Sequence, residues 1–426
     1  MASADTSAEL LPTYELTAIT DPGRRLVELA EANAALCAET AAIHDREGSF
    51  AVESIAALRE SGFFAGPVPE SHGGLGVDSV HDVMVAISRL ARADASTAIA
   101  ANMHLAGGAV IVRLLQRRRA EDDGSSVAVL ERLLTDVGAG RVVLCFPMTE
   151  AGTDLSSPFC EATPVDGGYT VTGRKLFGTI SPIADLFFPT VRVPNGRGGY
   201  LTATAMVTRD TPGLTIEDDW DALGMRASGS NSVTFTTCFV PQDRLFAIRD
   251  NYGRSGRWFP GFALTGNLPL AATYVGVAEA ARAHAVAATT RRKGTSGKRL
   301  ADRIPIQELM GAIEIDLAVC KATVERMGRL ADAFLERYVT TDPPTSEATA
   351  LMKESQCMKY VVNRKACEIV DRAMTVCGGG AYMNRHPLSQ LYRDARAGPF
   401  MQPFSPYEAL EYIGKVTLGL DPALER

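Results

Sequence analysis

The hydrophobic pattern changes its period twice along this chain, and this change limits the fold more than any other feature. Apolar residues recur at helical spacing over about 22–62 and again over 80–115. Between about 141 and 250 they alternate or form short apolar runs separated by Gly, Pro and Asp, which is typical of strands. Long amphipathic helical patterns then return over 268–290, 305–338, 346–377 and 405–418. The sequence therefore predicts an α+β protein in the order helices, antiparallel β-barrel, four-helix bundle.

These patterns divide the 426 residues into three expected domains. We expect an N-terminal helical domain over 17–140, a β-barrel domain over 141–250 and a C-terminal helical bundle over 255–420. The 43 Lys and Arg residues against 50 Asp and Glu residues give a net charge of −7, which disfavours a nucleic-acid partner. The eight cysteines are scattered, with no Cys-x-x-Cys and no Cys/His cluster at metal-ligand spacing. We therefore expect no metal site, and buried thiols in a reducing compartment.

The start of the chain lacks the pattern of a secretory signal, a basic segment followed by an apolar core. No run reaches the ~18 apolar residues that a bilayer span requires. We expect a cytoplasmic protein with no membrane partner.

Several Gly-containing motifs follow one another along the chain, and each is weak evidence when taken singly. Their order and spacing carry more weight, and together they resemble the acyl-CoA dehydrogenase superfamily over about residues 20–418. The motifs are Gly62–Gly76, Met148–Asp154 with Gly168–Lys175, Trp220–Ser230 with Phe239–Pro241, and the tail formed by Cys377–Ala381 and Arg393–Gly398.

The resemblance implies a flavin cofactor, FAD with FMN as the alternative. A flavin ring needs apolar cover and hydrogen-bond partners at its polar edge. By match to the family motifs, Met148 and Thr149 would lie at the pyrimidine edge of the ring. Phe177 would cover the ring, with Gly178 beside it, and Thr179 would bond near N5. From composition alone, Phe177 also fits an ordinary barrel core.

A second set of residues would reach the cofactor of a neighbouring subunit, if the resemblance holds. Arg292 matches the family's arginine for the FAD pyrophosphate, and a guanidinium binds phosphate oxygens in a bidentate way. Its alternative is a solvated basic run. Gly378 and Gly379 would let the backbone approach the cofactor, and Thr375 stands where many relatives place Gln. This sharing implies a homodimer or homotetramer.

The position of the family's catalytic glutamate, nine residues after Arg393, is occupied by Gln402. A carboxamide cannot take up a proton near neutral pH, so it cannot act as a general base. A second location used by some relatives corresponds to Gly266. Glu408 and Glu411 are nearby in sequence, but both fit the first turns of a closing helix. The neighbour Met401 stands where related monooxygenases keep a histidine.

Three hypotheses follow. The first is a flavin-dependent oxidoreductase that acts on an acyl thioester of CoA or a carrier protein, with Gln402 and Met401 lining the pocket. The second is a two-component monooxygenase on the same fold, which takes reduced flavin from a partner reductase. The third is a flavin-binding lyase without redox turnover, or a binding module. An electron acceptor or a flavin reductase is the expected partner. His104 is the best titratable candidate for the pocket, against the alternative of a hydrogen-bonded core residue.

Overall fold

The computed structural model describes residues 14–121, 124–153, 157–250, 260–293 and 297–424. Its first part is helical. The helix α1 begins after Thr20, whose side chain accepts a hydrogen bond from the backbone N–H of Gly23, and it ends at Gly48 in the left-handed conformation. The helices of this part are α1 (Asp21–Glu47), α2 (Val52–Glu60), α3 (Val80–Ala91), α4 (Ala95–Ala120) and α5 (Gly124–Gly138).

The helical pattern over 80–115 is divided between α3 and α4. The break lies at Asp94, whose carboxylate accepts hydrogen bonds from the backbone N–H groups of Ser96 and Thr97 and so caps α4. An apolar run alone does not show such a break, because both helices are buried on most sides. The helix α5 was not expected from the sequence.

Two sheets follow the helices. Seven strands form one sheet in the order β10-β6-β5-β2-β3-β9-β8, and β1-β4-β7 form the other. Two pairings, β1 with β4 and β2 with β5, are parallel, so the expectation of a wholly antiparallel barrel is wrong in this respect. The strands are β1 (Leu144–Cys145), β2 (Glu161–Val165), β3 (Gly168–Gly178), β4 (Leu186–Phe187), β5 (Thr190–Pro194), β6 (Tyr200–Ala205), β7 (Val207–Thr208), β8 (Leu214–Ile216), β9 (Asn231–Pro241) and β10 (Leu245–Asp250).

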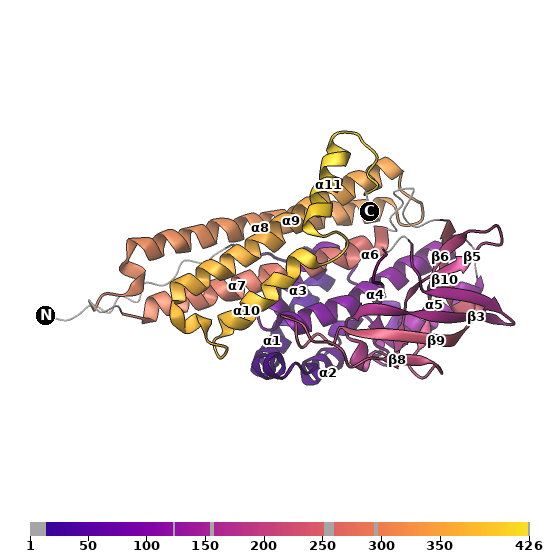
Figure 1. Cartoon of the computed structure of the whole chain (residues 1–426), viewed down its shortest axis with the longest axis horizontal. Coiled ribbons are helices and arrows are strands. Elements are labelled where there is room, and N and C mark those ends of the chain that lie inside the picture. Colours follow the sequence, from indigo (N-terminus) through magenta and orange to yellow (C-terminus); the bar gives the residue numbers. More distant parts are fainter. Residues whose placement is uncertain (1–13, 122–123, 154–156, 251–259, 294–296, 425–426) are drawn as a thin grey trace.

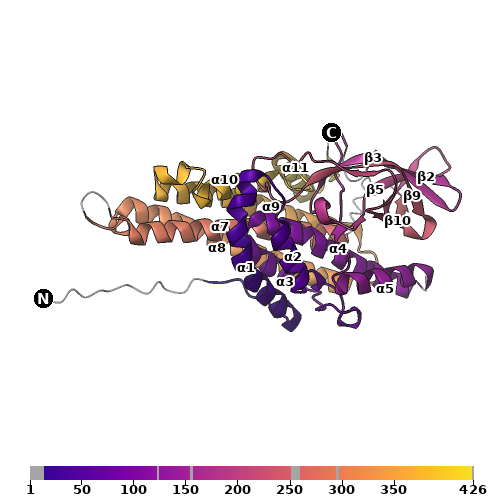
Figure 2. The ribbon, with the colours of Figure 1, turned by 90° about the horizontal axis from the view of Figure 1, so that it is seen from below.

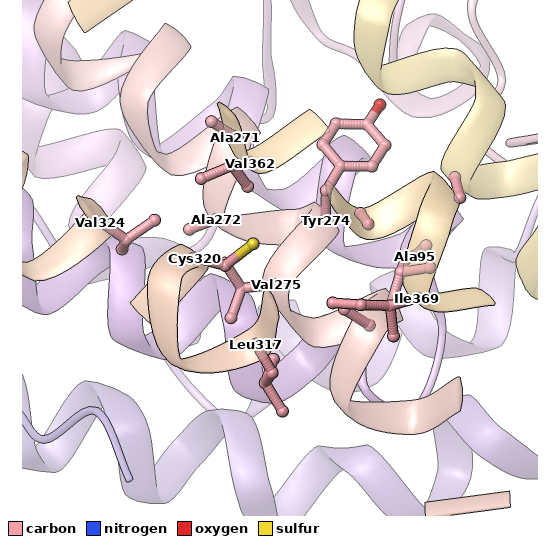
Figure 3. Close-up of a cluster of buried hydrophobic side chains, with 14 of the residues drawn as sticks. Ala95, Ala271, Ala272, Tyr274, Val275, Leu317, Cys320, Val324, Val362 and Ile369 are labelled. Atoms are coloured by element: carbon pink, nitrogen blue, oxygen red, sulfur yellow. The ribbon is translucent and has the colours of Figure 1, made fainter. Parts of the chain in front are cut away.

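The last part is a helical bundle built around α7. This helix is apolar on nearly every side, as expected for a helix surrounded by others. Figure 3 shows Ala271, Ala272 and Val275 of α7 packed with Leu317 and Cys320 of α8. The helices are α6 (Pro260–Thr265), α7 (Asn267–Arg291), α8 (Ile304–Arg337), α9 (Thr345–Cys377), α10 (Pro387–Ala397) and α11 (Pro406–Thr417).

The bundle and the sheets occupy opposite ends of an elongated molecule (Figure 1). The helices α3 and α4 lie between them, and α4 and α5 run beneath the strands in Figure 2. The helix α10 returns from the far end of the bundle toward the sheets, so the segment after it reaches the junction of all three parts. Short 3-10 turns complete the chain: η1 (Phe63–Ala65), η2 (Glu70–His72), η3 (Ser181–Ile183), η4 (Gln242–Arg244), η5 (Leu300–Asp302), η6 (Gly379–Tyr382) and η7 (Gly398–Phe400).

Within the described ranges, one helix, α4, is long and apolar enough to span a bilayer, contrary to the expectation from the sequence. Within the fold, 78% of its most apolar window is buried, as in the core helix of a globular domain. All eight cysteines are free and at least partly buried. Among the residues that the structure describes, no group of three His, Cys, Asp or Glu side chains could hold a metal ion.

Candidate active site

A cavity of about 400 Å³ lies where the helical parts meet the sheets. We call it the interdomain cavity. Six of the residues singled out from the sequence line it, although they come from distant parts of the chain. These residues are Met148, Thr149, Phe177, Thr179, Met401 and Gln402.

The backbone of β3 is strained where it borders the cavity. Phe177 has a φ of +56°, which is rare for a bulky side chain, and β3 shifts its register against β9 between Lys175 and Gly178. The Phe177 side chain remains 55% exposed and packs edge-on against Trp220 at a ring-centroid distance of 6.0 Å. An exposed aromatic ring held by a strained backbone indicates a binding surface rather than barrel core.

A buried ion pair fixes the strand segment opposite Phe177. Lys175 is fully buried, and its ammonium group donates to Glu150, to the Thr190 hydroxyl at 3.0 Å and to the Met148 carbonyl at 3.4 Å. Burial lowers the pKa of Lys175, and the neighbouring Cys160 and Glu150 oppose that effect. The pair therefore holds the backbone on both sides of Thr149.

Gln402 reaches across the cavity, and its amide nitrogen donates to the hydroxyl oxygen of Thr149. The segment that carries it is tied to α9 by two side chains. Lys359 donates to the carbonyls of Met401 and Phe404, and Asn363 donates to the Gly398 carbonyl at 2.6 Å. Burial lowers the pKa of Lys359 to about 8, against the opposing effect of Glu408. Gln402 is therefore held in place from both sides of its peptide.

A row of hydroxyl groups crosses the otherwise apolar wall. Thr179 and Ser230 lie 2.8 Å apart between their oxygens, and Ser230 and Ser228 lie 2.7 Å apart. The sequence reading included both serines in a family motif but did not place them at the site. A row of this kind can hydrogen-bond the edge of a planar ring or pass a proton between neighbours.

The described part of the cavity wall contains no Asp, Glu, His or Lys. Its ionisable groups are Arg393, which is paired with Asp45 in a bidentate way, and Arg396. Glu408 accepts hydrogen bonds from the backbone and hydroxyl of Ser405 and caps α11, as the sequence predicted. Glu411 forms an ion pair with Lys415 of the same helix.

The alternative base location, Gly266, supplies no acid either. Its carbonyl accepts a hydrogen bond from Asn102 at 2.9 Å, and its neighbour Asn267 lines the cavity.

His104 does not line the interdomain cavity, so its selection as a catalytic candidate is not supported. It is buried, stacks on Phe64 at 4.4 Å, and accepts a hydrogen bond at Nδ1 from the Leu144 backbone N–H. Its other ring nitrogen faces the Phe64 carbonyl at 3.2 Å, so it carries the proton. Burial lowers the pKa of His104 to about 4, and the ring is neutral. The contacts of His104 are those of a hydrogen-bonded core residue, the alternative given in the sequence analysis.

Gly178 serves the packing of the strands. A side chain there would meet the Asn231 carbonyl of β9 at 2.8 Å.

The remaining predicted residues form a separate group at the end of the bundle that points away from the sheets (Figure 1). Arg292 donates to the Cys377 carbonyl at 2.6 Å, and Thr375 donates to the Asp371 carbonyl at 3.1 Å. A Cβ atom added at Gly378 or Gly379 would meet no atom within 4 Å outside the neighbouring residues. One chain therefore does not bring this group to the interdomain cavity, and its role at the cofactor of a neighbouring subunit stays a prediction.

Comparison with known proteins defines the class. Three family models match, which describe the acyl-CoA dehydrogenase N-terminal domain over 26–116, the middle domain over 145–238 and the C-terminal domain over 265–402. The chain belongs to the acyl-CoA dehydrogenase superfamily, which confirms the resemblance and the fold class drawn from the sequence.

Within this family the chain is similar to nitrososynthases. It is 33% identical to the amino sugar nitrososynthase DnmZ of Streptomyces peucetius over 405 residues, which cover 94% of each chain. It is 33% identical to the L-evernosamine nitrososynthase of a Micromonospora species over 95% of this chain and 92% of that protein. The structure of KijD3 in complex with FMN and dTDP-3-amino-2,3,6-trideoxy-4-keto-3-methyl-D-glucose superimposes with a TM-score of 0.87, at 34% identity and 96% coverage of both chains.

Proposed function

We propose that this protein is a flavin-dependent N-oxygenase that acts on the amino group of a sugar attached to a nucleoside diphosphate. The observation that carries the proposal is the interdomain cavity, whose described wall offers hydrogen-bonding groups and arginines but no carboxylate. Similarity to amino sugar nitrososynthases over nearly the whole chain supports the substrate class. The FMN in the KijD3 complex supports FMN as the flavin, where the sequence reading favoured FAD.

The missing carboxylate separates two reactions. Oxidation of an acyl thioester begins with removal of a proton from carbon, and loss of a positioned base typically slows such a step by ~10² to 10⁴. Oxygenation of an amine uses the lone pair on nitrogen and breaks no C–H bond. A cavity whose described wall carries no carboxylate therefore suits the amine reaction better than the thioester reaction that the sequence alone favoured.

The proposed reaction balances with a reductase as the electron source. Each round uses one O₂, two electrons and two protons, places one oxygen atom on nitrogen and releases the other as water. The first round converts the amine to a hydroxylamine. A second round adds another oxygen atom to the hydroxylamine and releases one water molecule. The N,N-dihydroxy product then loses a second water molecule and becomes the nitroso compound.

The residues of the cavity fit a flavin and an amine. When bound and reduced, the flavin would supply the activation of O₂. Phe177 offers an exposed ring for stacking, and Thr149 and Thr179 offer hydroxyls for the polar edge. Gln402 uses its amide nitrogen on Thr149, so its amide oxygen can accept a hydrogen bond from the substrate amine and orient the lone pair.

Completion of the cofactor site by a partner subunit remains part of the proposal. Arg292 and Gly378, which directly follow the last residues of α7 and α9, do not line the interdomain cavity of their own chain. A homodimer or homotetramer in which the partner's group meets the cavity would account for both sets of residues.

The test measures O₂ uptake with FMN, a flavin reductase and a dTDP-amino sugar, and the incorporation of ¹⁸O from ¹⁸O₂ into the product. The matched control substrate carries a hydroxyl in place of the amine. We expect a labelled hydroxylamine or nitroso product from the amine and none from the control. If acyl thioesters bleach the flavin without air while the amino sugar is not oxygenated, the proposal is wrong. The protein is then an acyl thioester dehydrogenase, the first hypothesis drawn from the sequence. Absence of both reactions would favour a lyase or binding module.

A further inference from the structure

A second hollow, of about 320 Å³, adjoins the interdomain cavity. We call it the α9 groove. It is lined on one side by Tyr360, Arg364 and Glu368 of α9, and on the other by Arg396 and Phe404. Arg396 lines both the groove and the cavity, so its side chain lies between the two hollows. A ligand that follows the Arg396 side chain would reach from the cavity to the groove.

Arg396 is placed differently from Arg393, the other arginine of the cavity. Arg393 is engaged by both carboxylate oxygens of Asp45. Arg396 is exposed, and its guanidinium carbon lies 4.8 Å from the ring centroid of Phe400. No carboxylate lies within ion-pair distance of Arg396 in the part of the chain that the structure describes. Stacking on Phe400 holds the guanidinium plane while its N–H groups stay available.

The charges around Arg396 are mainly positive, although the chain as a whole carries −7. Lys359, Arg364 and Arg396 line the groove together with a single carboxylate, Glu368. That carboxylate already forms ion pairs with Arg364 and with two residues that do not line the groove, Lys365 and Arg372. An anion at the junction therefore meets a local excess of positive charge.

The walls beyond Arg396 suit a planar group. The groove wall contains the ring of Tyr360, the edge of a buried Phe404 that packs against Tyr412, and the apolar Pro399, Pro406 and Ala409. Aromatic faces bind nucleobases by stacking. The Arg396 guanidinium thus stands between the interdomain cavity, with its row of hydroxyl groups, and the groove, which contains Tyr360.

We propose that Arg396 binds the diphosphate of a nucleoside-diphosphate-linked substrate, with the nucleoside in the α9 groove and the reacting group in the interdomain cavity. This inference rests on the proposed function for the identity of the reacting group. A guanidinium binds two phosphate oxygens at once, which fixes both the position and the direction of the ligand. The diphosphate chemistry is shared by a nucleotide sugar and by CoA, so the test separates these sources.

The experiment measures binding by calorimetry at low salt, with the full chain and oxidised FMN at constant concentration. The ligands are dTDP, UDP, ADP and CoA. We expect dTDP to bind the wild type, and Arg396→Gln to weaken binding roughly 10- to 100-fold, the range for loss of a charge-assisted contact. Arg396→Lys should be intermediate, because an ammonium group keeps the charge but loses the fork. The matched control is Arg197→Gln, an exposed arginine in the turn between β5 and β6.

The outcomes distinguish this inference from the proposed function. If Arg396→Gln binds dTDP as the wild type does, or if the wild type binds no nucleoside diphosphate, the inference is overturned. If CoA binds in an Arg396-dependent way and dTDP does not, the diphosphate site stands and the amino sugar reaction falls. If the amino sugar is oxygenated with the same KM by wild type and Arg396→Gln, the reaction stands and the diphosphate site falls.

Discussion

Replacement of Lys359 by methionine tests whether a buried charged amine holds the segment that carries Gln402. Burial lowers the pKa of Lys359 from 10.5 to about 8, so between these pH values the unfolded chain binds more protons than the folded chain. The contribution of Lys359 to stability therefore rises with pH through this window. At about 1.4 kcal/mol for each pH unit, the full increment is about 3 kcal/mol, of which about 2 falls between pH 8 and about pH 10.

At neutral pH the Lys359→Met variant has two opposing effects. It removes the cost of burying a charge, about 3 kcal/mol, and it deprives the carbonyls of Met401 and Phe404 of their donor, at roughly 1–3 kcal/mol each. The net change in the free energy of unfolding should lie between a gain of about 1 kcal/mol and a loss of about 3 kcal/mol. Turnover should fall by at least about tenfold, because Gln402 loses its support on this side.

The assay is urea unfolding at fixed protein concentration from about pH 7 to about pH 10, analysed as the difference between wild type and variant. The difference matters because buried thiols such as Cys145, whose pKa is raised by burial, lower stability over the same range. Lys298→Met, at an exposed lysine, is the control and should leave the profile unchanged. If the curves of wild type and Lys359→Met run parallel over the whole range, Lys359 is not a buried ammonium and the reasoning is refuted.

Three further predictions follow from the site. His104→Gln should leave kcat unchanged but lower the free energy of unfolding by about 1–3 kcal/mol at pH 7. Because the pKa of His104 is lowered to about 4, the wild type should lose about 3 kcal/mol of stability as the pH falls from 6.5 to 4. A His104→Gln variant that shows the same loss would contradict a neutral buried ring. Phe177→Gly should raise the melting temperature, because relief of the positive φ is worth about 1 kcal/mol. The same variant should weaken flavin binding, measured by fluorescence titration, at least about tenfold. Unchanged flavin affinity would show that Phe177 does not belong to the site. Gln402→Glu should lower the rate of amine oxygenation by about 10-fold or more, because a carboxylate cannot donate a hydrogen bond to Thr149. The new carboxylate should also allow acyl thioesters to reduce the flavin in the absence of air. An unchanged oxygenation rate would exclude the orienting role of Gln402.

The long helices of the bundle could be predicted from the sequence because a sustained period needs no knowledge of the partner. The patterns over 268–290, 305–338 and 346–377 match α7, α8 and α9 to within a residue at each end. The strands β2, β5, β8 and β10 were not predicted, because strands of three to six residues depend on their neighbours for pairing. The helix α10 was also missed, although Pro387 at its first turn after the capping His386 was a usable signal.

The site residues that belong to a sequence motif could be predicted. Those brought to the site only by folding could not. Thr149, Phe177 and Gln402 were found by match to the family motifs, and the structure brings them to one cavity. Lys359 could not be found, because its contact with the 401–404 segment joins residues 42 and 45 positions apart. Lys175 reads as an exposed residue on a strand, and only the fold shows that it is buried against Glu150.

The pair formed by Asp45 and Arg393 joins residues 348 positions apart and holds one wall of the interdomain cavity. During synthesis, the ribosome must therefore release nearly the entire polypeptide before that wall can exist. A fragment that stops before α10 lacks Arg393 and therefore cannot complete this wall. Binding of a ligand in the complete cavity has to wait until almost the whole chain has been synthesised.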